Sequence, residues 1–173
     1  MNLKLKRIYQ ISLFIIYIAL LVFFAYESLK DGTASGESSN RIGNIIASII
    51  EFFTGKEFVI TDRFNYLIRK FIGHFSYFVL LGCISCLFYS SFSKKMKDLE
   101  LLSIVHFATG LMYAFMTEFL FQMIAVDRMP SLLDVFIDYF GFIFLSVIIL
   151  KMIYFKNFLK KLSKTHSEMR INI

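Results

Sequence analysis

Four long apolar blocks alternate with shorter polar segments along the chain. They run from about Ile8 to Tyr26, from Phe71 to Phe92, from Leu101 to Val126 and from Leu132 to Phe155. A hydrocarbon core of ~30 Å takes about 20 residues of helix to cross, which each block supplies. Backbone groups in lipid must be hydrogen-bonded internally, so each block is expected to be helical despite its Val, Ile and Phe content. The pattern predicts an all-α membrane protein, a four-transmembrane-helix bundle that forms a single integral membrane domain over residues 1–173.

The first apolar block has a second interpretation as a signal peptide, because Lys4, Lys6 and Arg7 precede it. Its apolar stretch is longer than the apolar region of a signal peptide, however. No A-x-A-like cleavage site closes it either. We therefore interpret the block as the first transmembrane helix.

The largest segment outside the apolar blocks is residues 27–70, which we expect to be extracellular. Its first part, KDGTASGESSN, is typical of a flexible linker. The next part, RIGNIIASIIEFF, repeats apolar residues at helical spacing and predicts an amphipathic helix over about residues 40–53, with Ser38, Ser39 or Asn40 as its N-cap. This helix is expected either to lie in the outer membrane interface or to pack over the mouth of the bundle.

Thr61 marks the start of the second membrane helix. Phe64, Leu67 and Ile68 follow it at helical spacing. A Thr placed just before such a run is a favoured N-cap. The helix is therefore expected to begin near Asp62, several residues before its most apolar part.

Composition agrees with the membrane assignment. Of 173 residues, 57% are hydrophobic and the mean hydropathy is +0.65, above the usual range of a soluble domain. The net charge of +6 and the pI of about 9.3 would suggest nucleic-acid binding in a soluble protein. Here the basic residues lie mainly at the ends of apolar blocks, so membrane lipids are the expected partners and nucleic acid is not.

The distribution of Lys and Arg predicts the orientation of the bundle. These residues concentrate at the N-terminus, after the second block and in a basic tail over residues 156–173, whereas the turn after the third block contains only Arg128. The basic flanks comprise Lys4, Lys6, Arg7, Lys94, Lys95, Lys97, Lys151, Lys156, Lys160, Lys161, Lys164 and Arg170. Cytoplasmic loops are enriched in Lys and Arg, so both termini are expected in the cytoplasm and residues 27–70 outside it.

The two cysteines, Cys83 and Cys86, have the C-x-x-C spacing of a thioredoxin-like site. They lie inside the apolar run FVLLGCISCLFYS. We interpret both thiols as small packing groups within a helix rather than as a redox site.

Ionisable residues inside the apolar blocks are the main functional signal. A charged group in a membrane is costly and faces the bundle interior or water, so each one suggests a site. The candidates are His74, His106, Glu118, Asp134 and Asp138, with Lys70, Gln122 and Arg128 close to them in the sequence. With the predicted orientation, all of them except His106 fall in the outer half of the bundle.

Six of these residues form three pairs at i, i+4 spacing, and each pair lies on one face of its helix. The pairs are Lys70 with His74, Glu118 with Gln122, and Asp134 with Asp138. Three helices could thus direct their pairs into one outward-open cavity, with Arg128 at its rim. The predicted ligand-binding residues are Lys70, His74, Glu118, Gln122, Arg128, Asp134 and Asp138.

Structural explanations stand beside this prediction. Asp134 could simply stabilise the first turn of its helix, and Arg128 could lie among lipid headgroups. Glu118 and Asp138 could belong to an interhelical salt-bridge or hydrogen-bond network. His106 lies on a helix face with small and hydroxylated residues, so we interpret it as a packing residue.

His74, Glu118 and Asp138 also offer atoms suitable for binding a metal. The sequence nevertheless has no recognised ligand motif such as H-E-x-x-H, so neither a metal nor another cofactor is expected. A Gly-rich phosphate loop and a nucleophile elbow are absent from it as well.

The stretch TEFLFQMIAVDRMPSLLDVFIDYFG resembles the signature of the VanZ-like membrane family, in which a Glu and a nearby Gln precede an Arg, an Asp, an Asn or Asp, and a Gly. The matching residues are Glu118, Gln122, Arg128, Asp134, Asp138 and Gly141, together with Lys70, His74, Tyr77 and Gly82 in the second helix. The chain departs from the pattern by one extra residue between the Glu and the Gln and by one between the basic residue and the His. Val-Asp also replaces Pro-Gly before Arg128.

The resemblance implies a bacterial cytoplasmic-membrane protein linked to teicoplanin-type glycopeptide resistance or to cell-envelope modification. In the first hypothesis it binds a lipid-linked or cell-wall ligand, or the glycopeptide itself, with Lys70 and Arg128 contacting anionic groups. In the second it is an intramembrane enzyme, with Glu118 or Asp138 as general base, His74 as proton shuttle and Arg128 holding a phosphate. A transporter is a weaker third option, because four helices are few and no inverted repeat is visible.

Overall fold

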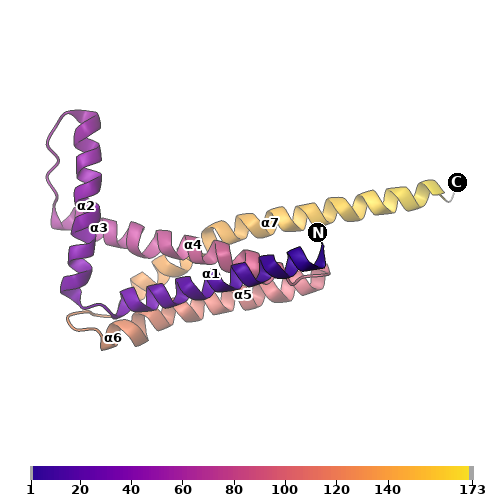
Figure 1. Ribbon diagram of the computed structural model, residues 1–173, viewed down its shortest axis with the longest axis horizontal. Coiled ribbons are helices and arrows are strands. Elements are labelled where there is room, and N and C mark those ends of the chain that lie inside the picture. The colour runs from indigo at the N-terminus through magenta and orange to yellow at the C-terminus, as the bar shows by residue number, and fades with distance from the viewer. Residues whose placement is uncertain (1, 172–173) are drawn as a thin grey trace.

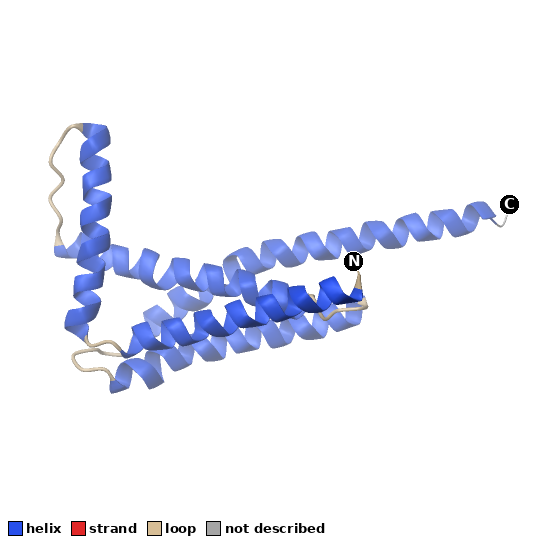
Figure 2. Ribbon diagram, viewed as in Figure 1, coloured by secondary structure: helices blue, strands red, loops and turns tan. Residues whose placement is uncertain are grey.

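The computed structural model describes residues 2–171, and it describes the side chains of these residues except 161 and 164–171. Three basic residues assigned to the tail, Lys161, Lys164 and Arg170, therefore have side chains outside the described set. The described residues form helices and short connections without any strand (Figure 2). The elements are α1 (Leu3–Leu29), α2 (Gly32–Thr54), α3 (Asp62–Ile68), η1 (Arg69–Phe75), α4 (Ser76–Ser90), α5 (Met96–Met116), η2 (Thr117–Phe121), α6 (Gln122–Ile124) and α7 (Leu132–Ile171).

Four continuous helical stretches are long and apolar enough to cross a membrane. They span Leu3–Leu29, Asp62–Ser90, Met96–Ile124 and Leu132–Lys160, which confirms the four predicted membrane helices. The stretches run up and down beside one another, so that the N-terminus and the far end of α7 lie at the same end of the bundle (Figure 1). α4 packs mainly against α7 and α1, and α5 packs mainly against α7 and α4.

The outer surface of the bundle is strongly apolar. Ile104 is 67% exposed and Phe136 is 70% exposed, for example, and every one of the four stretches carries similar side chains. A soluble protein rarely leaves so continuous an apolar surface in water. The surface therefore agrees with a protein that lies in lipid.

The predicted linker between the first membrane helix and the amphipathic helix is wrong, because α2 begins at Gly32. Asp31 caps this helix by accepting a hydrogen bond from the Ala34 amide at 3.0 Å. Ser38 and Ser39 lie inside the helix, where each hydroxyl donates to the carbonyl four residues earlier. Sequence composition favoured a flexible segment, but a single Asp N-cap is enough to begin the helix early.

α2 packs on α3 through its small residues rather than through its isoleucine stripe. Ser39, Gly43 and Ala47 are buried at i, i+4 spacing. A Cβ atom at Gly43 would lie 2.8 Å from Asn65 Oδ1, so the two helices approach closely there. Ile45, by contrast, is 62% exposed. α2 stands across one end of the bundle and extends beyond it (Figure 1).

Thr61 caps α3 as predicted: its hydroxyl accepts a hydrogen bond from the Phe64 amide at 3.2 Å, and the helix begins at Asp62. From there the second membrane stretch continues through η1 into α4 without a break.

Two π-helical turns interrupt the membrane stretches near the α2 end of the bundle. η1 contains Lys70 and His74, and η2 contains Glu118. π turns of this kind occur frequently at functional sites. Two of the three pairs predicted to share a helix face, Lys70 with His74 and Glu118 with Gln122, therefore lie at π turns.

Glycine allows α7 to approach the second membrane stretch closely. A Cβ atom at Gly141 would lie 2.5 Å from the carbonyl oxygen of Phe75, and one at Gly82 would overlap the backbone of Phe142. Phe78 and Phe142 fill the core beside these contacts. The close approach holds the first turns of α7 against η1.

Candidate functional site

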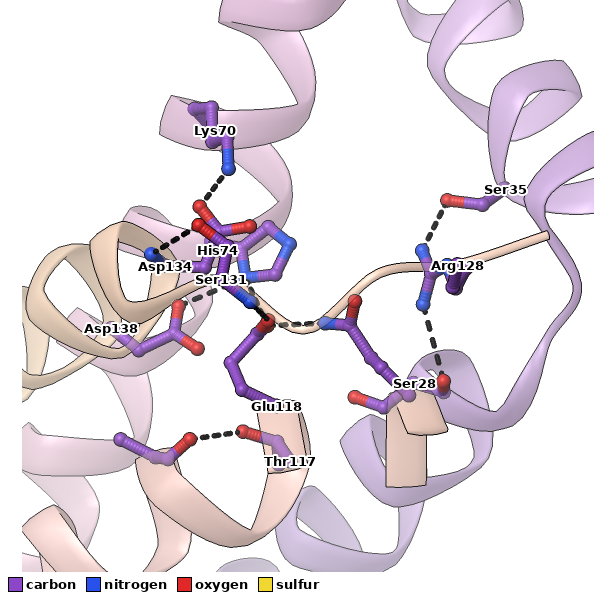
Figure 3. Close-up of polar contacts among 12 residues, drawn as sticks. Ser28, Ser35, Lys70, His74, Thr117, Glu118, Arg128, Ser131, Asp134 and Asp138 are labelled. Atoms are coloured by element: carbon purple, nitrogen blue, oxygen red, sulfur yellow. Dashed lines mark hydrogen bonds and ion pairs between the residues drawn. The ribbon is translucent and has the colours of Figure 1, made fainter. Parts of the chain in front are cut away.

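The polar side chains predicted from the three i, i+4 pairs gather at one level of the bundle, near α2 (Figure 3). Lys70 and Asp134 form an ion pair between η1 and α7. Both side chains are almost fully buried. Removing either partner would leave a buried charge without its counter-ion, so the pair ties the two elements together.

His74, Glu118 and Asp138 form the centre of the site, one each from η1, η2 and α7. A hydrogen bond of 3.0 Å joins His74 Nδ1 to Asp138 Oδ1. The same nitrogen lies 3.8 Å from Glu118 Oε1. Glu118 and Asp138 are completely buried, and His74 is 6% exposed. We call these three residues the central triad.

Two further groups orient the Glu118 carboxylate. The side-chain amide of Gln122 donates to Oε1, and the backbone N–H of Ser131 donates to Oε2 at 3.3 Å. Ser131 lies in the turn that begins α7. Asp138 has fewer partners, because its Oδ2 atom is buried and finds no hydrogen bond among the described residues.

Arg128 lies apart from the carboxylates, on the α6–α7 connection. Its guanidinium donates to the Ser28 carbonyl at 3.1 Å and to Ser35 Oγ at 2.5 Å, which links α1 to α2 (Figure 3). Burial and the nearby Arg69 lower the pKa of Arg128, while Glu118 and other acidic residues act in the opposite direction. A guanidinium nevertheless stays protonated in proteins.

A cavity of about 240 Å³ lies between α1, α2, η1 and the α6–α7 connection. Its apolar lining residues are Phe23, Phe24, Ile42, Ile68 and Ile72. Its polar lining residues include Arg69, Arg128, His74, Glu27, Tyr77 and several serines. Because His74 reaches this wall, the cavity and the central triad are in direct contact.

The structure brings six of the seven predicted ligand-binding residues into one cluster: Lys70, His74, Glu118, Gln122, Asp134 and Asp138. Arg128 belongs to the cavity but not to this cluster. Sequence reasoning missed Arg69, Ser28 and Ser35. Arg69 adjoins Lys70 in the sequence and could have been included, whereas Ser35 lies in the segment interpreted as a linker.

A second buried polar pair lies towards the other end of the bundle. Ser85 Oγ and His106 Nδ1 form a hydrogen bond of 2.7 Å between α4 and α5. The His106 ring stacks on Phe142, and the hollow beside it has no room for a water-sized group. His106 therefore packs inside the bundle as predicted, although its Nε2 atom finds no hydrogen-bond partner among the described residues.

The cysteines occupy α4 as expected. Neither forms a disulfide, Cys86 is buried, and its thiol donates a weak hydrogen bond to the Ser146 carbonyl at 3.8 Å.

Comparison with known proteins identifies no matching family model, no similar characterised protein and no similar solved structure.

Proposed function

We propose that this chain is a VanZ-like membrane protein whose cavity binds the phosphate-bearing headgroup of a lipid-linked ligand, such as a cell-wall precursor. Arg69 and Arg128 line one cavity, and neither forms an ion pair with any other described residue. Two like charges that share a half-buried space repel each other, and an anion placed between them removes that repulsion. The proposal rests on this observation of two arginines in one cavity, neither with an ion-pair partner among the described residues.

The residues that line the cavity suit such a ligand. Arginine binds phosphate through a planar fork of N–H donors, and the Ser28 and Ser35 contacts already hold the Arg128 guanidinium in place. Apolar lining residues such as Phe24 and Ile72 suit the first carbons of a lipid chain. An arginine that is ordered before binding loses less entropy when the ligand arrives.

In the cell, this activity would serve teicoplanin-type glycopeptide resistance or another modification of the cell envelope in the bacterial cytoplasmic membrane. The distribution of Lys and Arg supports cytoplasmic termini and a cavity that opens to the outside. α2 would then be extracellular, with exposed apolar residues such as Ile45 and Phe53 in the outer interface.

The binding proposal is tested with purified protein and undecaprenyl phosphate in detergent. Arg128→Gln should weaken binding about 10- to 100-fold, because a hydrogen bond to a charged group contributes about 1.5–3 kcal/mol. Arg63→Gln is the matched control, since Arg63 is an exposed arginine on the neighbouring α3. Equal affinities for wild type and Arg128→Gln would contradict the proposal.

The cellular role is tested by teicoplanin and vancomycin susceptibility in a Gram-positive host. Wild type should raise teicoplanin resistance, and Arg128→Gln or Glu118→Gln should abolish the gain at equal membrane levels. Well-expressed wild type without any gain would remove glycopeptide resistance from the proposal and leave the binding site to be judged by the lipid assay.

The proposed orientation is tested by cysteine labelling in a background with Cys83 and Cys86 replaced by Ala. Glu57→Cys lies after α2, and Lys94→Cys lies between α4 and α5. A membrane-impermeant maleimide should label Glu57→Cys in intact cells and Lys94→Cys only after permeabilisation. The reverse pattern would invert the topology.

The second candidate function is an intramembrane enzyme that acts on a lipid headgroup or cell-wall precursor. The His74–Asp138 hydrogen bond beside Glu118 favours it, because a carboxylate-oriented imidazole is a common acid–base device. Glu118→Gln and Asp138→Asn keep the side-chain shapes and remove the base. Resistance that survives both changes at normal protein levels would exclude this function.

A further inference from the structure

The central triad presents a problem of buried charge. Glu118 and Asp138 are two fully buried carboxylates within 4.8 Å of each other, measured between candidate ligand atoms. Lys70, which shares η1 with His74, is paired with Asp134, and the Arg128 guanidinium binds Ser28 and Ser35 instead. An isolated buried carboxylate is strongly unfavourable unless a proton or a cation neutralises it.

The partners already in place leave that charge uncompensated. Gln122 and the Ser131 amide each give Glu118 one neutral hydrogen bond. Asp138 Oδ1 is hydrogen-bonded to His74, and its Oδ2 atom has no hydrogen-bond partner among the residues that the structure describes. The Asp138 carboxylate is directed towards the space between His74 and Glu118 (Figure 3).

The spacing of the three side chains suits a metal ion. Zinc binds nitrogen and oxygen ligands at about 2.0–2.1 Å, and the edge of a tetrahedron with such bonds is about 3.3–3.4 Å. The two distances from His74 Nδ1, 3.0 Å to Asp138 Oδ1 and 3.8 Å to Glu118 Oε1, bracket that edge. All the candidate ligand atoms lie within 4.8 Å of one another, so side-chain shifts that shorten the longer distances would bring all three onto one ion.

We propose that His74, Glu118 and Asp138 bind a divalent transition-metal ion of the Zn²⁺ type. One imidazole and two carboxylates form a ligand set that zinc accepts, and the charge of the ion cancels that of the two carboxylates. Gln122 and Ser131 then hold the Glu118 carboxylate in its ligating orientation, as hydrogen-bond partners of metal ligands commonly do. The sequence contains no contiguous ligand motif for this site, because the three ligands come from separate helices.

The site differs from a closed structural zinc centre because it has three protein ligands and borders a cavity. His74 lies on the cavity wall, so a fourth position on the ion would be open to water or to an anionic ligand. Metal binding needs only the central triad and does not depend on lipid phosphate entering the cavity.

The test uses the full-length protein, purified in detergent, stripped with EDTA and incubated with Zn²⁺. Metal content after gel filtration should be about one ion per chain, and Zn²⁺ should raise the melting temperature. Asp138→Asn and His74→Gln should each weaken Zn²⁺ binding at least about 100-fold, at or beyond the roughly 10- to 100-fold loss caused by removing an outer hydrogen-bond partner. Co²⁺ in place of Zn²⁺ should give the visible absorption bands of a four- or five-coordinate site.

His106→Gln is the matched control, because it removes a buried histidine outside the triad and should keep metal binding. Glu118→Gln provides a second conservative variant if another fails to fold. Zn²⁺ binding that is equal in wild type and in folded triad variants would mean an adventitious ion only and would overturn the inference, as would wild type without bound metal. Arg128→Gln separates the two proposals, since it should reduce undecaprenyl phosphate binding while Zn²⁺ binding is retained.

Discussion

The bundle contains two sets of buried polar side chains, and they differ in what surrounds them. The inner pair, Ser85 and His106, makes one hydrogen bond in a tightly packed region without carboxylates or free space. A buried atom without a partner occurs in both sets, His106 Nε2 in one and Asp138 Oδ2 in the other, but the central triad contains two carboxylates and lies beside a cavity. Burial of a polar group therefore does not by itself indicate a site. Buried charge beside a cavity is the stronger reason to propose one.

The largest expected change in stability follows from breaking the Lys70–Asp134 ion pair, which lies beside the central triad. Asp134→Ala should lower the free energy of unfolding by about 3–5 kcal/mol, because it leaves Lys70 buried without a partner. The double variant Lys70→Met/Asp134→Leu should recover most of this loss. Unfolding in SDS–detergent mixtures measures both, and wild-type stability in Asp134→Ala would show that the pair has no structural role.

The inner pair should respond in stability alone. Ser85→Ala leaves His106 Nδ1 without a partner, as Nε2 already is, and should lower the free energy of unfolding by about 1–3 kcal/mol. Ser85→Ala combined with His106→Phe should be closer to neutral, since both polar groups are then removed. Undecaprenyl phosphate binding should stay at the wild-type level in both variants. A fall in affinity would show that the inner pair contributes to ligand binding and is not only a packing contact.

Substitutions in the central triad should abolish function while changing the free energy of unfolding least of all. In metal-free protein, Glu118→Gln should alter the free energy of unfolding by less than about 1 kcal/mol or should raise it, because it removes a buried charge and keeps the shape. Resistance in the cell should nevertheless be lost. A strong destabilisation measured in the same SDS assay would identify Glu118 as a structural residue.

The sequence predicted the membrane helices and the cluster well, because both depend on patterns local to one helix. Apolar length marked the four spans, and the i, i+4 pairs placed Glu118 and Asp138 on faces that could meet. Charged residues in apolar surroundings have few stable places to lie, so their convergence could be expected.

Other features depend on contacts between distant segments and could not be predicted. The early start of α2 at Gly32 brings Ser35 to Arg128, although the composition around Ser35 is that of a linker. The separation of Arg128 from the carboxylates follows from the α1 carbonyl of Ser28, and a backbone acceptor leaves no signal in the sequence.

The two π-helical turns have a consequence for changes in chain length. A π turn holds one residue more than an α turn, so it can absorb a single insertion without rotating the rest of the helix by about 100°. Two such turns lie where the polar pairs stand, η1 between Lys70 and His74 and η2 between Glu118 and Gln122. Each turn would thus absorb a single-residue insertion in its own helix, and the outline of the cluster would outlast such changes in the length of the segments that carry it.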